Sequence, residues 1–163
     1  MKNNISIRTI LFSAVSITLL HSCSNLKLKT EGRISKGIFP EGKKGPSTNF
    51  TGNAFNTGLI EPDSIYNTLV GNVYFEPGAR SNWHLHPGGQ ILIILDGKGY
   101  HQIKDQPKQK LKKGDVVKCP PNVLHWHGAS PDVGMQQMYI VPNTGKGIVD
   151  WKQAVTDEEY TGL

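Results

Sequence analysis

Cysteine is scarce in this chain, with two residues among 163. A disulfide framework is therefore excluded, because Cys23 and Cys119 could form a single bridge at most. A lone thiol in a folded domain usually packs as a small apolar group, so we expect Cys119 to be buried and unreactive. The alternative is that Cys119 lines a pocket, since it lies just before a predicted turn.

Long hydrophobic runs are also missing. The apolar stretch 10–20 is well short of the roughly 20 residues that a membrane-spanning helix needs. With its basic start, it is typical of a secretory signal, so we expect residues 1–22 to be a lipoprotein signal peptide. Leu20-His21-Ser22-Cys23 resembles a bacterial lipobox, which predicts a lipid anchor on Cys23 in the bacterial cell envelope, in the periplasm or at the outer membrane. An ordinary cleaved signal is the alternative.

A strong excess of one charge is absent as well, since the formal net charge is +5. The lysines between residues 104 and 113 have no aromatic residues among them, which is not the pattern of a nucleic-acid surface. We therefore expect a solvated basic hairpin in this segment and no nucleic-acid partner.

The chain divides by composition into a polar part and a domain. Residues 23–44 are rich in Lys, Gly and Ser and have no apolar periodicity, which predicts a flexible tether. Residues 45–163 are long enough for one domain with one hydrophobic core. They contain no repeat period, so we expect a single domain.

Helical periodicity is almost absent from residues 45–163. Short runs of β-branched and aromatic residues alternate with Gly, Pro, Asn and Asp, which predicts an all-β sandwich or barrel. Turns are expected at 96–99 and 114–115, and a helical turn only between 150 and 160. The expected strands are 53–60, 67–75, 82–86, 90–95, 99–103, 116–119, 124–127 and 135–141.

Segment 78–90 carries the clearest chemical signal. In an extended strand alternate side chains face the same side, so His84 and His86 point together. The Pro-Gly-Gly turn that follows lets Gln90 return toward the same point, and His125 opens a strand after a later turn. A His-x-His pair with a distant histidine predicts a metal site, for which His84, His86, Gln90 and His125 are the donors.

The spacing of these residues resembles the two signature motifs of the cupin superfamily. In the first motif, Gly78, His84, His86, Gln90 and Gly97 are separated by five, one, three and six residues. In the second motif, Gly114, Pro120, Asn122 and His125 are separated by five, one and two residues. Two departures are visible. The usual glutamate of the first motif is Gln90, and the second motif has Asn122 and Ala129 where glycine and asparagine are common.

The phrases WHLHPGGQ, GDVVKCPPN and HWHGASPD resemble a narrower group of small manganese-binding cupins. This group includes hydroxynitrile lyases and cupins that accompany carboxymuconolactone decarboxylase domains, and it accepts glutamine as a ligand. The resemblance spans about residues 45–155. It implies a double-stranded β-helix and a homodimer in which residues 50–60 pair with the partner's sheet. It also implies a divalent metal, with manganese favoured over iron, nickel or zinc.

Gln90 gives the predicted metal site an unusual charge. Three neutral imidazoles and a neutral amide leave a divalent ion uncompensated, so the ion should be a strong Lewis acid toward a carbonyl, cyanide, enolate or hydroxide. An amide oxygen is a weaker donor than a carboxylate. The alternative role for Gln90 is therefore a pocket-lining amide that binds a water.

Because the usual carboxylate is absent, another group must move a proton. His127 lies two residues after a predicted ligand and is the first candidate for the catalytic role, with His101 the second. A structural role or a solvent-exposed position is the alternative for each. The lyase resemblance implies a histidine on the next strand, but this chain has Gln137 there, and an amide cannot act as a base. Trp83 and Trp126 have the opposite strand parity and should pack in the core.

Three classes of function fit such a site, because one fold hosts many activities. The first, which we favour, is a metal-dependent enzyme that acts on a small carbonyl or hydroxy compound by lyase or isomerase chemistry. The second is a metal-dependent dioxygenase, which needs a redox-active ion with open coordination positions. The third is a non-catalytic module that binds a small ligand. In each class the partner is a small molecule.

Overall fold

The computed structural model describes residues 37–162. The predicted signal peptide, Cys23 and most of the predicted tether lie outside this range, so the lipid anchor and the envelope location stay predictions, as does the homodimer. The described end of the tether contacts the domain: strand β1 (Lys43–Lys44) pairs with β3 (Ala54–Ile60). No helix within residues 37–162 has the length and apolar character that crossing a bilayer requires.

The described residues form mainly β-strands. Turns between the strands fall at residues with left-handed backbone, among them Gly89 (φ 83°) and Asn122 (φ 60°). Asparagine tolerates this conformation, which explains how Asn122 replaces the usual glycine. The remaining elements are β2 (Phe50–Thr51), β4 (Thr68–Phe75), β5 (Arg80–Ser81), β6 (His84–Leu85), β7 (Gln90–Ile103), β8 (Gln109–Lys112), β9 (Val116–Cys119), β10 (His125–Ala129), β11 (Met135–Pro142), η1 (Thr144–Lys146), β12 (Asp150–Trp151) and α2 (Asp157–Thr161).

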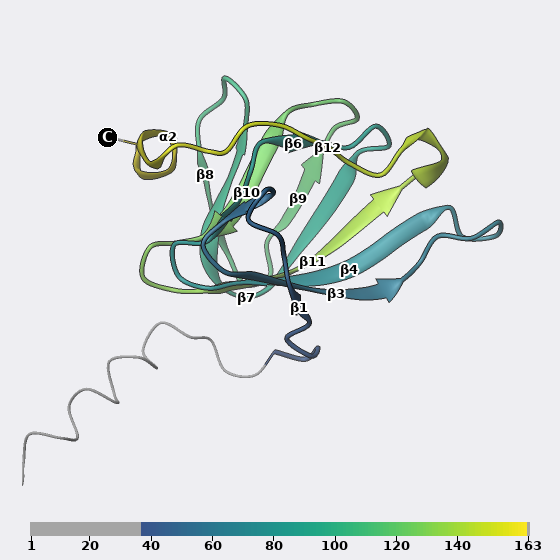
Figure 1. Ribbon diagram of the computed structural model, residues 1–163, viewed down its shortest axis with the longest axis horizontal. Helices are drawn as coiled ribbons and strands as arrows, with labels where there is room; N and C mark the ends of the chain where they lie inside the picture. Colours follow the sequence, from purple (N-terminus) through teal and green to yellow (C-terminus); the bar gives the residue numbers. More distant parts are fainter. Residues whose placement is uncertain (1–36, 163) are drawn as a thin grey trace, which may run out of the picture.

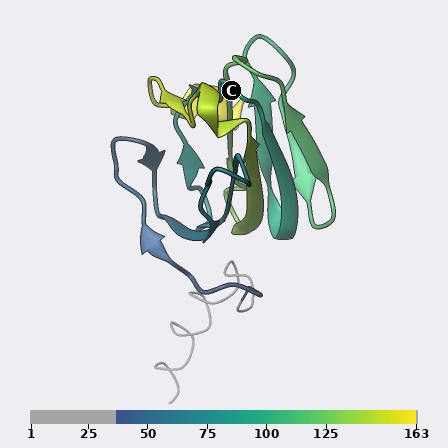
Figure 2. The ribbon, with the colours of Figure 1, turned by 90° about the vertical axis from the view of Figure 1, so that its right-hand side faces the viewer.

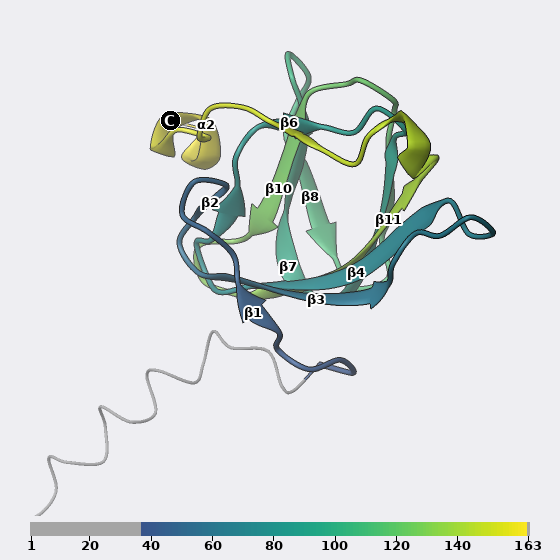
Figure 3. The ribbon, with the colours of Figure 1, turned by 45° about the vertical axis from the view of Figure 1, so that its right-hand side comes forward.

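Strand β7 joins the two halves of the barrel. Its first half pairs with β9 and β11, and its second half pairs with β8 and β10. The sheet therefore runs in the order β1-β3-β4-β11-β7-β10-β5-β2, with β6 paired to β10 and β12 paired to β6. Figures 1 and 3 show how this antiparallel sheet curls, with β3 and β4 below the opening and β6 across the top. The all-β, double-stranded β-helix predicted from the sequence is confirmed.

One predicted turn is wrong. Strand β7 passes through residues 96–99 without interruption, because Gly97 bends the chain within the strand (φ 81°) as it leaves one half of the barrel for the other. The basic segment contains a strand as well as loops: in β8, Leu111 is buried while its neighbours are exposed. The helical turn expected near the end of the chain is α2.

The hydrophobic core has two parts, on opposite faces of the same strands. Inside the barrel, Phe75 and Leu92 belong to a buried cluster drawn from both halves. On the other face, Trp83 and Trp126 meet at a ring distance of 6.5 Å and pack with Val155 and Tyr160. The predicted core role of both tryptophans is confirmed.

The C-terminal segment holds this outer cluster in place. Arg80 donates hydrogen bonds to the carbonyl oxygen of Val155 (3.2 and 3.0 Å), and the Tyr160 hydroxyl donates to the carbonyl oxygen of Ala129 (2.7 Å). Helix α2 begins with a capping box formed by Thr156 and Glu159. Figures 1 and 2 show α2 on the outside of the barrel, at the end away from β1. Just before this segment, β12 pairs with β6 and so fixes the strand that carries His84.

Gly97→Ala is expected to destabilise the domain more than Gly114→Ala. Both glycines have left-handed backbone (φ 81° and 90°), so alanine at either position costs about 1 to 2 kcal/mol of strain. A Cβ at Gly97 would also overlap the carbonyl oxygen of Gly134, whereas a Cβ at Gly114 meets no atom within 4 Å. Urea unfolding should show an additional loss of roughly 1 to 3 kcal/mol for Gly97→Ala. Equal losses would contradict the steric argument.

Candidate metal centre

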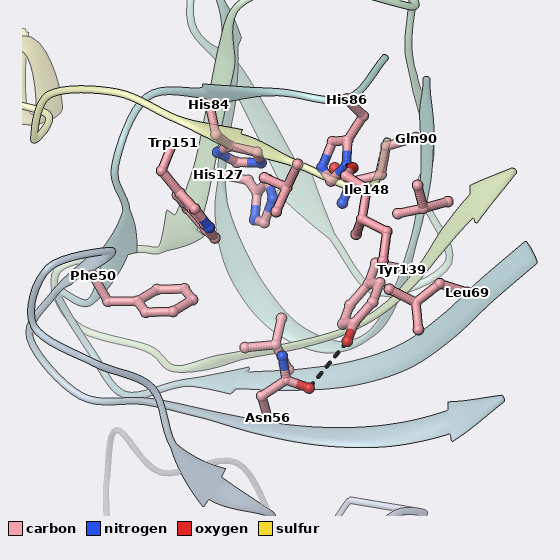
Figure 4. A pocket seen from close by; sticks show the side chains of 13 residues that line it. Phe50, Asn56, Leu69, His84, His86, Gln90, His127, Tyr139, Ile148 and Trp151 are labelled. Carbon is pink, nitrogen blue, oxygen red and sulfur yellow. Dashed lines mark hydrogen bonds between the residues drawn. The ribbon is translucent and has the colours of Figure 1, made fainter. Parts of the chain in front are cut away.

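A pocket lies inside the barrel, with a volume of about 620 Å³ when its open mouth is included. Figure 4 shows His84, His86, Gln90 and His127 along one side of this pocket, and Asn56 with Tyr139 across from them. The rest of the lining is apolar and comprises Phe50, Leu69, Val73, Val141, Ile148, Val149 and Trp151.

Three histidines are each oriented by a hydrogen bond between Nδ1 and a backbone carbonyl oxygen. The pairs are His84 with Asn82 (2.9 Å), His125 with Val123 (2.9 Å) and His86 with Ile148 (2.5 Å). A carbonyl oxygen only accepts, so the proton of each neutral ring lies on Nδ1 and the lone pair lies on Nε2. Metal-binding histidines are held in this way.

The histidine side chains gather closely around the end of the pocket. The donor atoms of His84, His125 and His127 all lie within 4.8 Å of one another. His86 stands beside this group, with its ring centroid 5.2 Å from that of His84 and 5.7 Å from that of His125. Nε2 of His86 and of His127 is buried and has no hydrogen-bond partner among the described residues. Buried nitrogens of this kind are rare. A metal ion would account for Nε2 of His86, whereas Nε2 of His127 stays available inside the pocket.

Gln90 completes the predicted set of donors. Its Oε1 lies 3.2 Å from Nε2 of His125. Because the carbonyl of Val123 places the ring proton on Nδ1, the two facing atoms are both acceptors. Two acceptors at this distance suit a shared cation, so His84, His86, Gln90 and His125 fit a divalent metal ion.

His127 differs from the other histidines in its hydrogen-bond partner. Its Nδ1 faces Nε2 of Gln137 at 2.9 Å, and Oε1 of Gln137 is buried with no partner in the described part of the chain. An amide can donate or accept, so Gln137 does not restrict His127 to one tautomer in the way a carbonyl does. Gln137 thus contacts His127 and is not among the residues that line the pocket.

His101 and Cys119 form a buried pair beside the histidine cluster, with the ring centroid of His101 5.7 Å from that of His125. The Nε2 of His101 lies 3.3 Å from Sγ of Cys119. Burial lowers the pKa of His101 to about 4 and raises the pKa of the Cys119 thiol to about 12, so both are neutral near pH 7. The expected burial of Cys119 is confirmed. His101, the second candidate for proton transfer, does not line the pocket.

Burial also keeps the pocket histidines neutral. Loss of solvation is the largest cause, and it lowers the pKa of His86, brings the pKa of His125 to about 3, and places the pKa values of His84 and His127 well below the usual range. The neighbouring imidazoles lower the pKa values of His84, His125 and His127 further. A histidine must be neutral to bind a metal, so this environment favours ligation.

The aromatic lining of the pocket was not predicted from the sequence. Phe50 and Trp151 meet edge to face with ring centroids 5.5 Å apart, and the Trp151 ring lies 4.8 Å from that of His84. Both residues lie on two-residue strands that give no periodic signal. Tyr139 has the strand parity of Gln137, which is the one sequence feature that could have placed it inside.

Replacing single histidines should distinguish the histidines that bind the metal ion from those that only lie beside it. His84→Ala and His86→Ala are each expected to weaken metal binding by at least roughly 10- to 100-fold, because even residues that only support a ligand have effects of this size. His127→Ala and the control His101→Gln should keep the metal. Elemental analysis of chain purified without chelators, followed by chelator competition, measures this. Metal kept by His86→Ala and lost by His127→Ala would instead place the ion among His84, His125 and His127.

Stability of the metal-free domain should fall as the pH falls below about 6.5. Unfolded histidines bind a proton below this pH, whereas His101 and His125 stay neutral down to about pH 4 and 3. The unfolded state therefore binds more protons in this window, and low pH favours it. We expect the free energy of unfolding to fall by at least roughly 2 to 3 kcal/mol between pH 7.5 and 5.5 in urea titrations with chelator, because His101 and His125 alone contribute this much and the lowered pKa values of His84, His86 and His127 act in the same direction. His101→Gln should reduce the dependence of the unfolding free energy on pH. A stability that does not change with pH would contradict the prediction.

Comparison with known proteins agrees with this fold. The cupin domain model matches residues 71–139. The (R)-mandelonitrile lyase of Granulicella tundricola is 39% identical over 117 residues, which are 72% of this chain and 89% of that protein. Acireductone dioxygenases match shorter stretches, and the one from Dictyostelium discoideum is 44% identical over 46 residues, 26% of this chain and 31% of that protein.

Solved structures give the same result. A cupin-like protein of Thermotoga maritima is 48% identical, with a TM-score of 0.76 over 78% of this chain and 96% of that one. A DMSP lyase of Ruegeria pomeroyi shares the fold at 18% identity, with a TM-score of 0.55 over 67% of this chain and 54% of that one. The chain belongs to the cupin superfamily, as shown by these similarities together with its barrel, its two motifs and its cluster of histidines.

Proposed function

We propose that this cupin is a metal-dependent enzyme that acts on a small carbonyl or hydroxy compound by lyase-type Lewis-acid chemistry. The observation that carries the proposal is the neutral donor set. Imidazole nitrogens and one amide oxygen meet at one side of an apolar pocket, and no carboxylate is among the residues that line it. The similarity to a mandelonitrile lyase supports the same class of reaction.

His84, His86, Gln90 and His125 are the residues that would hold the ion, and we favour manganese because the motifs resemble those of manganese cupins. When bound, the ion supplies positive charge that stabilises a negative charge on a substrate oxygen. The neutral ligands leave that positive charge undiminished. The apolar walls limit the entry of water, which strengthens electrostatic interactions within the pocket.

His127 is the group that we propose for proton transfer. Its Nε2 is the ring nitrogen without a partner among the described residues, and the side chain lines the pocket. Nε2 would take a proton from the substrate hydroxyl group and give it to the leaving group. For this step the proton of the neutral ring must lie on Nδ1, and the amide of Gln137 can accept it there once its Oε1 is turned toward His127. A relocated proton transfer of this kind needs no histidine at position 137.

Dioxygenase chemistry is a second candidate, favoured by the similarity to acireductone dioxygenases. That similarity reaches 47% of this chain at 29% identity in the protein of Schizosaccharomyces pombe, and it covers 45% of that protein. The neutral amide of Gln90 distinguishes this site from the usual glutamate-containing motif. Oxygen consumption by the iron-loaded chain, in place of cleavage by the manganese-loaded chain, would identify this activity.

The manganese-loaded chain is expected to cleave (R)-mandelonitrile to benzaldehyde and cyanide. His127→Ala should lower kcat by about 100- to 10,000-fold, the range of general acid-base catalysis, while the manganese content stays unchanged. Benzaldehyde release, measured beside elemental analysis of the same samples, tests both statements.

His101→Ala is the matched control, because His101 is a buried histidine that does not line the pocket. This variant should keep both metal and activity. Full activity in His127→Ala would remove His127 from the mechanism. If the fully metal-loaded wild-type chain cleaves neither (R)-mandelonitrile nor related cyanohydrins, the lyase proposal is wrong. The dioxygenase and ligand-binding functions then remain.

A further inference from the structure

The pocket has polar groups at two opposite places. The histidines and Gln90 lie on one side, whereas Tyr139 and Asn56 lie across the cavity from them, joined by a hydrogen bond (Figure 4). The rest of the lining is apolar and includes Val73 and Val141. A ligand that fills this space would meet polar groups at both ends and an apolar wall in the middle.

The position of Tyr139 depends on a glycine in the neighbouring strand. Gly71 of β4 is the direct partner of Tyr139 in β11, and a Cβ at Gly71 would overlap the Tyr139 hydroxyl group. Glycine weakens a strand interior and often marks a close approach of another group. Here the missing side chain leaves the space in which Tyr139 lies across β4 and reaches Asn56 of β3.

Tyr139 and Asn56 keep hydrogen-bonding capacity for a ligand. The Tyr139 hydroxyl donates to Oδ1 of Asn56 over 3.1 Å, which uses the one hydroxyl proton. The hydroxyl oxygen can still accept, and Nδ2 of Asn56 can still donate. Partial burial raises the pKa of Tyr139, so the hydroxyl stays protonated at neutral pH.

The wall beside the histidines is aromatic. Phe50 and Trp151 pack edge to face, and Trp151 also contacts the ring of His84. Aromatic side chains arranged in this way offer favourable contacts to a planar ring. The apolar middle of the pocket therefore suits an aromatic body better than a charged or flexible polar one.

We infer that Tyr139 and Asn56 determine specificity by hydrogen bonding to a polar group on the substrate end remote from the reacting carbon. The substrate class is then an aromatic carbonyl or hydroxy compound with a hydroxyl group on the far side of its ring. The inference rests on the proposed function for the chemistry at the histidine end, but recognition at the Tyr139 end can be measured without turnover.

Binding of two unreactive probes tests the inference. In isothermal titration calorimetry of the metal-loaded chain, 4-hydroxybenzyl alcohol should bind about tenfold more tightly than benzyl alcohol, the gain expected from one or two hydrogen bonds. Tyr139→Phe and Asn56→Leu should each reduce this ratio to about two or less while the Kd of benzyl alcohol stays unchanged. The unchanged Kd shows that the variant pocket is intact.

Tyr66→Phe is the matched control, because this tyrosine is exposed and does not line the pocket. It should keep the wild-type ratio. The inference is overturned if wild-type chain binds both probes equally, or if Tyr139→Phe keeps the preference. A preserved preference in a chain without lyase activity would overturn the proposed function alone, and lyase activity without the preference would overturn this inference alone.

Discussion

Hydrogen bonds from histidine Nδ1 to backbone carbonyl oxygens are the interaction on which the metal centre depends. They place the lone pair on Nε2 in His84, His86 and His125 and prevent these rings from rotating. For two of the three, the carbonyl belongs to the residue two positions earlier in the same segment. For His86, the carbonyl is that of Ile148, 62 residues away, so this histidine is oriented only when the chain after β11 has folded over the pocket.

Neutrality is the second property of the site. Burial and crowding hold the histidines in their uncharged form, and amides stand at the two positions where an ionisable group is expected, Gln90 and Gln137. The first amide leaves the charge of a bound ion available to a substrate. The second accommodates both protonation states of His127. Together these residues favour stabilisation of an anion, with His127 as the group that moves the proton.

The same strands also serve the pocket and the outer core. His84 lines the cavity and its ring centroid lies 4.4 Å from that of His125, while the adjacent Trp83 and Trp126 face outward and pack under the C-terminal segment. Because strand side chains alternate, outward packing fixes the inward side chains as well. Arg80, Tyr160 and the capped helix α2 therefore support the metal centre from a distance, by holding the strands on which its ligands lie.

The sequence by itself determined the barrel, most strands, the gathering of histidines at one site and the outward tryptophans, because period-two alternation and motif spacing are local properties of the chain. It failed at Gly97, where a turn signal proved to be a bend inside β7, and it missed the short strands that carry Phe50 and Trp151. Only the tertiary structure decided that Ile148 orients His86, that Gln137 pairs with His127, and that Gly71 leaves space for Tyr139. Each of these contacts joins distant segments, and no spacing along one segment encodes it.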